Sequence, residues 1–349
     1  MQYPAESTLR DRTFDRLKRS LAGEETDGHA VFNYYTFPFF HNLTGVPLDQ
    51  YYHDPKTTFE IQTEVFEQLE KCGSYHPDVG PVAECSALGG IVRFDSHGFI
   101  SVKESGIEEL DEALELEPGD PYGDNYMRVA LETLEYMVDH APADIKVNAP
   151  NFMAPFTVAA QLRGISDFCA DTILEPDFVQ ALLDVTTETS IRYMKACQKV
   201  LGRPLHHILM SDDLSSFLSL PDYKKWVVPT YQKIFAAFPD TQIWLHNDAG
   251  ANHLCEAIAD VGFKAWQYAP SLPSDFAMEH TGKRVCLFGG LSPLDLQTTS
   301  AQQTYDMCIE KLKSFGGNNK FVLGVGGSVN QVPIENLMAM FHAADDFKI

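Results

Sequence analysis

A short apolar run that ends in three polar side chains is the part of this sequence best suited to chemistry. Residues 243–250 read IWLHNDAG, so His246, Asn247 and Asp248 follow directly on apolar positions. A buried strand that delivers an imidazole and a carboxylate to its own C-terminal end, just before a glycine, is how an α/β barrel presents catalytic groups. His246 and Asp248 are therefore the first active-site candidates. The structural alternative is that they only cap the following helix.

The composition describes a globular chain with an acidic surface. The 349 residues carry a net charge of -23 and are 44% hydrophobic, a length and composition that suit one barrel domain. Such a charge repels nucleic acid phosphates and anionic lipid, which excludes nucleic acid and membrane surfaces as expected partners. The seven cysteines form no C-x-x-C pair, and the sequence contains neither a signal-peptide pattern nor a membrane-length apolar run. We therefore expect a protein of the reducing cytoplasm.

The elements that must position the candidates alternate between strand and helix. An amphipathic helix at residues 8–21, within a lead-in of residues 1–28, precedes the first strand. Helices are predicted at 55–71, 125–140, 157–162, 175–201, 222–238, 252–261 and 300–315, with a last one opening at Pro333. The predicted strands are 29–37, 75–82, 145–149, 206–210, 242–246, 263–268, 284–288 and 320–325.

Eight strands separated by helices predict an α/β fold, a (β/α)8 TIM barrel in a single domain of residues 29–349. The stretch 92–124, which contains the acidic run GIEELDEALELEPGD, has no clear period and is interpreted as an insertion after strand two. No G-x-G-x-x-G motif follows an early strand, which argues against a dinucleotide-binding fold.

In a barrel the C-terminal ends of all strands share one mouth, so residues far apart in sequence converge there. The candidates of this kind form two groups. The catalytic candidates are Asp78, Glu84, Asp212, His246 and Asp248, and the substrate-binding candidates are Asn33, Tyr35, Asn151, Asp213, Gln267 and Asn330.

Two kinds of chemistry remain open for these groups. A histidine with two or three carboxylates can hold a divalent metal, here through His246, Asp248 and Glu84, or can work as a general acid and base. Adjacent acids such as Asp212 and Asp213 point to opposite sides of a strand end, so one can face the site while the other caps a helix. The aromatic residues at 34–40 either line a pocket for a flat substrate or belong to the core.

Several longer stretches resemble the uroporphyrinogen decarboxylase superfamily, which includes cobalamin-dependent and coenzyme M methyltransferases. They are APNFMAPFTVAAQLRG at 149–164, SDDLSSFLSLPDYKKWVVPTYQKIFAAF at 211–238, WLHNDAGANHLCEAIADVGFKAWQ at 244–267, LFGGLSPLDLQ at 287–297 and FVLGVGGSVNQVPIENLMAMFHAA at 321–344. The resemblance covers most of the chain from about residue 40 and implies the same (β/α)8 barrel.

The sequence departs from known members of this superfamily at two places, and both limit the activity that the resemblance implies. The decarboxylases carry an arginine-rich motif after the first strand, where this sequence reads FNYYTFPFF. Without those cations, a chain of charge -23 is poorly suited to a substrate with many carboxylates. The thiol-methylating members bind zinc through a His-x-Cys pair after strand five and a further cysteine after strand eight. In this sequence Asp248 stands in place of the first cysteine, and the last loop, LGVGGSVNQ, contains no cysteine. A histidine and carboxylate set makes a harder, more Lewis-acidic site.

The leading hypothesis is a methyltransferase that moves a methyl group from a small donor, such as a methoxylated aromatic, to the Co(I) of a corrinoid carrier protein. Such O-demethylation would use a metal, zinc for instance, or an acid near His246 and Asp248. The sequence has no D-x-H-x-x-G stretch, so the carrier would be a separate protein. A metal-free decarboxylase and a non-catalytic corrinoid- or tetrapyrrole-binding protein are the alternatives. The family also makes a homodimer an expectation.

Overall fold

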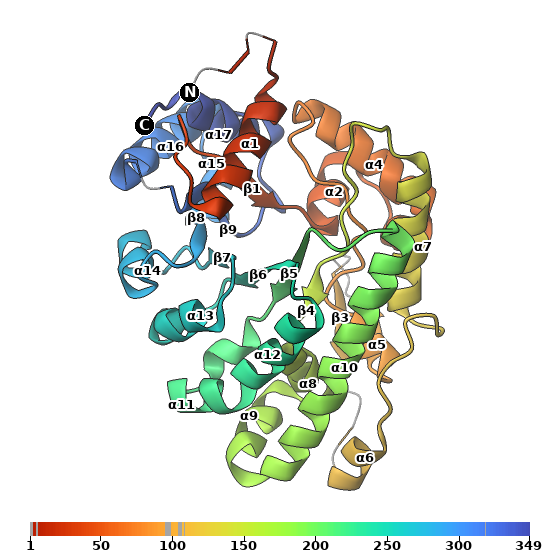
Figure 1. The fold of residues 1–349 in the computed structure, drawn as a ribbon. Coiled ribbons are helices and arrows are strands. Elements are labelled where there is room, and N and C mark those ends of the chain that lie inside the picture. The colour runs from red at the N-terminus through yellow and green to blue at the C-terminus, as the bar shows by residue number, and fades with distance from the viewer. Residues whose placement is uncertain (1–2, 5, 95–98, 104–106, 108, 318) are drawn as a thin grey trace. The chain divides into compact units, whose positions relative to one another are not determined.

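The central element is a seven-stranded sheet. In the computed structural model, which describes residues 3–349 apart from 5, 95–98, 104–106, 108 and 318, the strand order is β1-β9-β8-β7-β6-β5-β4 (Figure 1). The pairs β1–β9, β8–β9, β7–β8 and β4–β5 are parallel. The strands are β1 Val31–Tyr34, β4 Phe152–Met153, β5 His207–Ser211, β6 Gln242–Asn247, β7 Ala265–Tyr268, β8 Cys286–Leu291 and β9 Phe321–Ser328.

Helices occupy most of the connections between these strands. In the first half of the chain they are α1 Leu9–Ala22, α2 Phe37–Thr44, α3 Leu48–His53, α4 Pro55–Gln68, α5 Ala83–Ala87, α6 Leu110–Glu115, α7 Tyr126–His140, α8 Pro155–Arg163 and α9 Ile165–Leu174. They continue with α10 Pro176–Leu201, α11 Leu220–Asp222, α12 Val228–Ala237, α13 Cys255–Val261, α14 Ser274–His280, α15 Pro293–Thr298, α16 Ala301–Phe315 and α17 Ile334–Asp346. Short 3-10 turns, η1 Leu214–Phe217 and η3 Asn252–Leu254, and the π-helical turn η2 Tyr223–Val227 complete the set.

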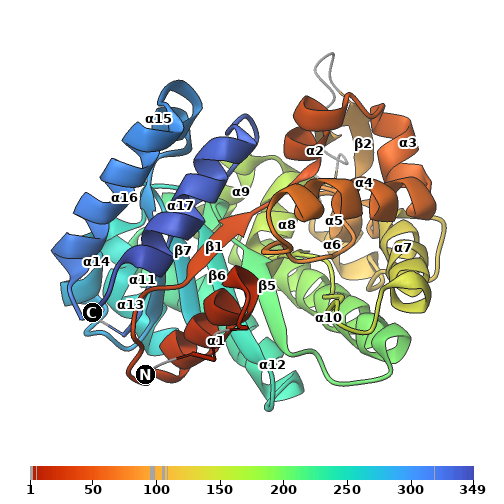
Figure 2. The ribbon, with the colours of Figure 1, turned by 90° about the horizontal axis from the view of Figure 1, so that it is seen from above.

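The chain divides into two compact units. The first consists of Met1–Gly45, Glu60–Gly73 and His246–Ile349. In it α16 packs against α17, and Figure 2 shows the two helices side by side. Both helices contact β9. Helix α1 is held to α17 by Arg16, whose fully buried guanidinium donates to Asp27 and to Asp345 at 2.9 Å each. Burying this cation is tolerable because two carboxylates pair with it.

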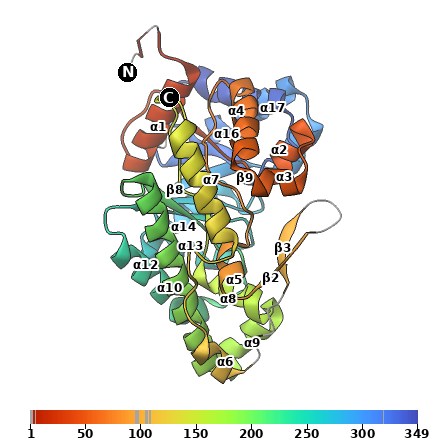
Figure 3. The ribbon, with the colours of Figure 1, turned by 90° about the vertical axis from the view of Figure 1, so that its right-hand side faces the viewer.

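The second unit consists of Val46–Phe59 and Ser74–Leu245. Its long helix α10 contacts α6, α7 and α8, and α7 runs alongside it (Figure 3). The strands β2 Ile91–Phe94 and β3 Ile100–Lys103 form an antiparallel pair of their own, separate from the main sheet. The stretch predicted as an insertion therefore holds β2, β3 and α6. Residues 106 and 108 of its acidic run lie outside the described residues.

Local signals in the sequence account for the ends of several helices. Thr8 and Asp11 form a reciprocal capping box at the start of α1, and Ser300 and Gln303 form another at α16. Gly23 ends α1 with a positive φ of 76°, which glycine adopts at little cost. The predicted helices at 8–21 and 300–315 are confirmed because hydrophobic period and cap agree.

Two predicted strands are much shorter than expected. Only Tyr75 of residues 75–82 pairs, in an isolated parallel bridge with Val147 of the third predicted strand. Pro77 and Pro81 lack the backbone N–H that a ladder needs, and the Asp78 carboxylate accepts from Gly80 N at 2.9 Å, which favours a turn. The third predicted strand, 145–149, is likewise reduced to the bridge at Val147, and β4 begins only after Pro150.

The aromatic segment after the first strand also differs from the prediction. Strand β1 ends at Tyr34, and Phe37–Thr44 forms α2, with Pro38 in its first turn. A proline there loses no helical hydrogen bond because the first N–H groups have no intrahelical acceptor. Hence Pro38 helps to start a helix here, whereas the sequence predicted a strand over residues 29–37.

Three further expectations concern the chain as a whole: membrane-spanning segments, cellular location and the number of domains. None of the helices in the described part of the chain has both the length and the apolar character needed to cross a membrane. The cytoplasmic location and the single domain stay predictions.

Candidate active site

Strand β6 carries the imidazole and the amide of the central motif. Ile243, Trp244 and Leu245 are buried, and His246 and Asn247 at the end of the strand are buried as well, with 6% and 1% of their surfaces exposed. Asp248, the first residue after the strand, is exposed. The apolar run thus anchors the strand, and its C-terminal end brings a buried imidazole next to a solvent-facing carboxylate.

Gln267 on β7 holds His246. Its Oε1 lies 2.8 Å from His246 Nδ1. The same amide donates through Nε2 to Val325 O and to Gly327 O, at 2.8 Å each. Carbonyl oxygens can only accept, so the NH2 group must face them and Oε1 must face the imidazole. His246 therefore donates from Nδ1, and in its neutral form Nε2 is the ring atom with the lone pair.

A pair of glycines in β9 makes this close packing possible. A Cβ on Gly326 would lie 2.4 Å from Tyr268 O, a distance that no side chain tolerates. Gly327 has a φ of +103°, and a Cβ there would lie 3.0 Å from Asp248 Oδ2. The glycines therefore let the backbone of β9 approach β7 and the Asp248 carboxylate.

Tyr34 is the member of the aromatic segment that lies against His246. The two ring centroids are 5.0 Å apart. Side chains alternate along a strand, so Asn33 lies on the other face of β1. Tyr35 follows the strand, and its ring packs against Phe39 and Phe66. Alternation was the available signal for choosing Tyr34, but the sequence did not reveal which face of β1 meets His246. The substrate-binding roles of Asn33 and Tyr35 stay predictions.

Asp212 and Asp213, which follow β5, have different environments. Asp212 is buried, and its two oxygens accept hydrogen bonds from Thr157 Oγ1 and Tyr231 Oη, each at 2.8 Å. Burial raises the pKa of Asp212 to about 6, although the hydroxyl hydrogen bonds oppose that rise. Asp213 is only partly buried and precedes η1, where its side chain makes no capping hydrogen bond. The two acids thus differ in burial, and the division of roles between them stays a prediction.

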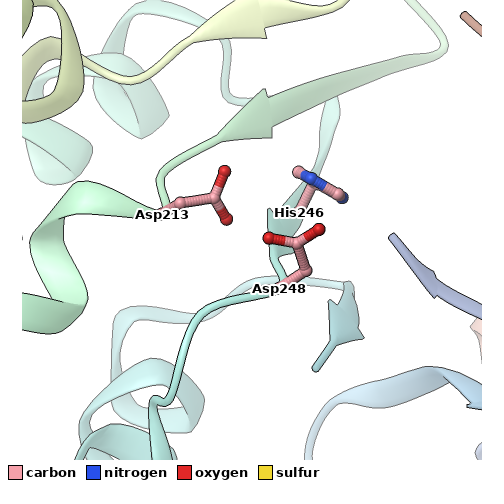
Figure 4. Close-up of side chains that lie close together, drawn as sticks. All are labelled: Asp213, His246 and Asp248. Carbon is pink, nitrogen blue, oxygen red and sulfur yellow. The ribbon is translucent and has the colours of Figure 1, made fainter. Parts of the chain in front are cut away.

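His246 and Asp248 form a pair suited to a metal ion. One ligand atom of His246 lies within 4.8 Å of a carboxylate oxygen of Asp248, and Figure 4 draws both side chains together with Asp213, which belongs to the other unit. An imidazole and a carboxylate suit a divalent ion that accepts nitrogen and oxygen ligands, such as zinc. The pair contains no cysteine, and the seven cysteines are free. A sulfur-ligated zinc site does not fit these residues.

Glu84, the third metal ligand expected from the sequence, belongs to the second unit. It lies on α5 with 1% of its surface exposed, and its Oε1 accepts from Met153 N at 3.0 Å. Burial raises the pKa of Glu84 to about 7. A carboxyl group of this kind can carry a proton near neutral pH, which keeps its catalytic role a prediction with a physical basis.

The other candidates make local contacts. Asp78 accepts from Gly80 N in the turn described above. Asn151 Nδ2 lies 3.5 Å from His76 Nε2, and His76 Nδ1 is 2.9 Å from Ser74 O. Because the carbonyl can only accept, His76 donates to it and offers Nε2 to the Asn151 amide.

Asn330 joins the last loop to the start of α2. Its Oδ1 accepts from Thr36 Oγ1 at 2.8 Å, and its backbone oxygen accepts from Asn42 Nδ2 at 2.8 Å. These bonds account for a structural role of Asn330, and its substrate-binding role stays a prediction.

Comparison with known proteins places this arrangement in a family. The chain is 24% identical over 202 residues to the methylated-thiol–coenzyme M methyltransferase of Methanosarcina mazei, a match that covers 57% of this chain and only 53% of that protein. It is 21% identical over 324 residues to a methylcobamide:CoM methyltransferase of Methanosarcina barkeri, covering 82% of this chain and 91% of that one.

A solved methyltransferase from Methanosarcina mazei has the same fold, with a TM-score of 0.82 at 22% identity over 98% of this chain and 99% of that chain. The profile of the uroporphyrinogen decarboxylase (URO-D) family matches residues 13–347. The resemblance predicted from the sequence is confirmed, and the chain belongs to the uroporphyrinogen decarboxylase family.

Proposed function

We propose that this protein is a methyltransferase that moves a methyl group from a small methylated donor to the Co(I) of a separate corrinoid carrier protein. The observation that carries the proposal is the pair His246 and Asp248, in which an imidazole held through Nδ1 lies beside a carboxylate. Relatives named as methylcobamide and methylated-thiol methyltransferases support the reaction class and the corrinoid partner.

The ligand types favour an oxygen-linked methyl donor over a thiol acceptor. His246 Nε2 and one oxygen of Asp248 would hold a divalent ion, zinc being the candidate. When bound, the ion supplies a Lewis acid that polarises the oxygen from which the methyl group departs. Activation of a thiol would instead call for sulfur-rich ligands, and the residue two after His246 is Asp248. A methoxylated aromatic is the donor class that we favour, which makes the reaction an O-demethylation.

The chain's own groups then have distinct tasks. Co(I) attacks the methyl carbon, the carbon–oxygen bond breaks, and the leaving oxygen gains a proton. Glu84 and Asp212 are the candidate acids, because their raised pKa values let them hold a proton close to neutral pH. Gln267 keeps the His246 ring in one orientation, and Tyr34 packs against that ring.

The finer structural expectations belong to the same proposal. The seven strands together with the bridge at Tyr75 would close an eight-stranded barrel in one domain, as in a (β/α)8 enzyme. The net charge of -23 favours a carrier protein that docks through a basic surface and binds more weakly as salt increases. A homodimer stays an expectation from the family.

A metal-free decarboxylase is the second candidate. The family name and the buried acid Glu84, with its pKa raised to about 7, favour it as a proton donor. Loss of carbon dioxide from a porphyrinogen or a simpler carboxylate by metal-free protein would support this candidate. Binding of corrinoid or tetrapyrrole without turnover of any donor would support a non-catalytic binding protein.

The decisive experiment mixes the purified protein with Co(I) cobalamin or a corrinoid protein and a panel of methoxylated aromatic and methylamine donors. Formation of methyl-Co(III) is followed by absorbance. We expect turnover with an oxygen-linked donor, loss of turnover in His246→Ala, and retention in the matched control His253→Ala, an exposed histidine nearby in sequence. Absence of turnover with every donor, from folded protein supplied with zinc, would overturn the proposal.

A further inference from the structure

We propose that Gln267 is a positioning residue that fixes His246 as the Nδ1–H tautomer and so presents Nε2 as the metal-binding atom. The inference rests on the proposed function for the identity of the ligand, but the tautomer itself follows from hydrogen bonds within one compact unit. Gln267 was expected from the sequence to contact substrate. In the structure its amide makes three hydrogen bonds to other groups of the protein.

The backbone of β9 sets the direction of the amide. Phe32 of β1 pairs with Gly324 but Tyr34 pairs with Ser328, so β9 bulges between those positions. The carbonyls of Val325 and Gly327, both within the bulge, accept the two protons of Gln267 Nε2. Reversing the amide would place its oxygen against two carbonyl oxygens, a repulsive arrangement in a buried site. The bulge thus determines that Oε1 faces His246.

The orientation of the Gln267 amide determines which ring nitrogen of His246 carries the proton. Oε1 of Gln267 can only accept, and His246 Nδ1 lies 2.8 Å from it, so the proton of the neutral ring is on Nδ1. Nε2 then carries the lone pair that a metal requires. Ligand histidines in metalloproteins are commonly fixed in this way by an acceptor on the other ring nitrogen, and loss of such an acceptor typically weakens metal binding by about 10–100-fold.

A second amide provides a matched control. Asn336 on α17 is also buried, and its Nδ2 donates to Leu296 O at 2.7 Å and to Thr299 O at 2.9 Å. Its Oδ1 has no hydrogen-bond partner among the described residues. Asn336 therefore ties two carbonyls together as Gln267 does, but bonds no histidine. Replacing either amide removes two backbone anchors, and only the change at Gln267 alters the partner of His246.

The test reads the tautomer directly. Metal-free protein labelled with 15N-histidine is examined by NMR, and the His246 signals are assigned by their loss in His246→Ala. We expect a hydrogen-bonded proton on Nδ1 in the wild type and in Asn336→Leu, and loss of its signal in Gln267→Leu. Gln267→Met, which keeps the side-chain length, is the second variant. A wild-type His246 with its proton on Nε2 would overturn the inference without any variant.

Metal affinity is the second readout. Binding of zinc, measured by competition with a chromophoric chelator, should weaken about 10–100-fold in Gln267→Leu and stay within about twofold in Asn336→Leu. Equal weakening in both variants would mean that Gln267 acts only through stability, and would overturn the inference while leaving the methyltransferase proposal intact. A wild type with the expected tautomer but no affinity for zinc or another divalent ion would instead remove the metal from the proposed function.

Discussion

The C-terminal ends of β5 and β6 are similar in sequence, but the acidic side chains that follow them have different environments. Each strand ends in buried residues followed by an acid, Asp212 after β5 and Asp248 after β6. Both oxygens of Asp212 accept hydrogen bonds from protein hydroxyls, and burial raises its pKa. Asp248 is exposed, and the neighbouring His246 donates from Nδ1 to the Gln267 amide. Similar strand ends thus place one carboxylate in the interior of the protein and the other at its surface, where a ligand can reach it.

The largest expected change in the free energy of unfolding comes from removing the Asp212 carboxylate, which tests this comparison directly. Asp212→Ala leaves the hydroxyls of Thr157 and Tyr231 buried without their acceptor, so we expect the free energy of unfolding to fall by about 3 kcal/mol. Asp213→Ala is the neighbouring control and should change it by no more than about 0.5 kcal/mol. Urea unfolding of the three proteins measures both values. Equal losses in the two variants would contradict the comparison.

The second prediction concerns the pH dependence that the buried Glu84 contributes. Its pKa is raised from 4.5 to about 7, so between these values the native protein binds more protons than the unfolded chain. The Glu84 contribution to the free energy of unfolding therefore falls as pH rises through this window, by on the order of 3 kcal/mol. Glu84→Gln lacks this contribution. The difference between variant and wild type should rise from pH 4.5 to 7 and level off above it; a constant difference would contradict the raised pKa.

The third prediction addresses the glycine beside Asp248. Gly327→Ala forces a side chain into a positive φ and places its Cβ 3.0 Å from Asp248 Oδ2. We expect the free energy of unfolding to fall by about 1–2 kcal/mol, together with weaker zinc binding as the carboxylate shifts. Gly202→Ala, at a glycine with positive φ but open space around its Cβ, controls for the backbone strain alone. Unchanged zinc affinity in Gly327→Ala would show that the β9 bulge does not influence metal binding at the candidate site.

The smallest expected effect on stability is also the most direct test of ligand binding. Asp248→Asn keeps the shape of an exposed side chain, so the free energy of unfolding should change by less than about 0.5 kcal/mol. Its affinity for zinc should nevertheless fall at least about tenfold, because a charged ligand is lost. Chelator competition and urea unfolding on the same sample measure both. Wild-type affinity in Asp248→Asn would exclude this carboxylate from the metal site.

The elements with strong local signals were predictable. Strands 242–246 and 320–325 and the helices at 8–21 and 300–315 appear close to their predicted limits, because apolar periodicity and capping residues agree there. The predicted strand at 75–82 is reduced to a bridge, because two prolines and an Asx turn oppose a ladder. The helix at Phe37–Thr44 was missed since its aromatic residues also suit a strand.

The sequence by itself determined which residue types stand at the strand ends, including His246, Asp248 and the pair Asp212 and Asp213. Only the tertiary structure decided which of those groups are buried and which distant side chains bind them. Thr157 and Tyr231 bind Asp212 from α8 and α12, and Gln267 reaches His246 from β7 under the direction of two carbonyls of β9. Such partners are distant in the chain, and a hydrogen bond depends on atoms within about 3 Å, which no spacing in the sequence specifies.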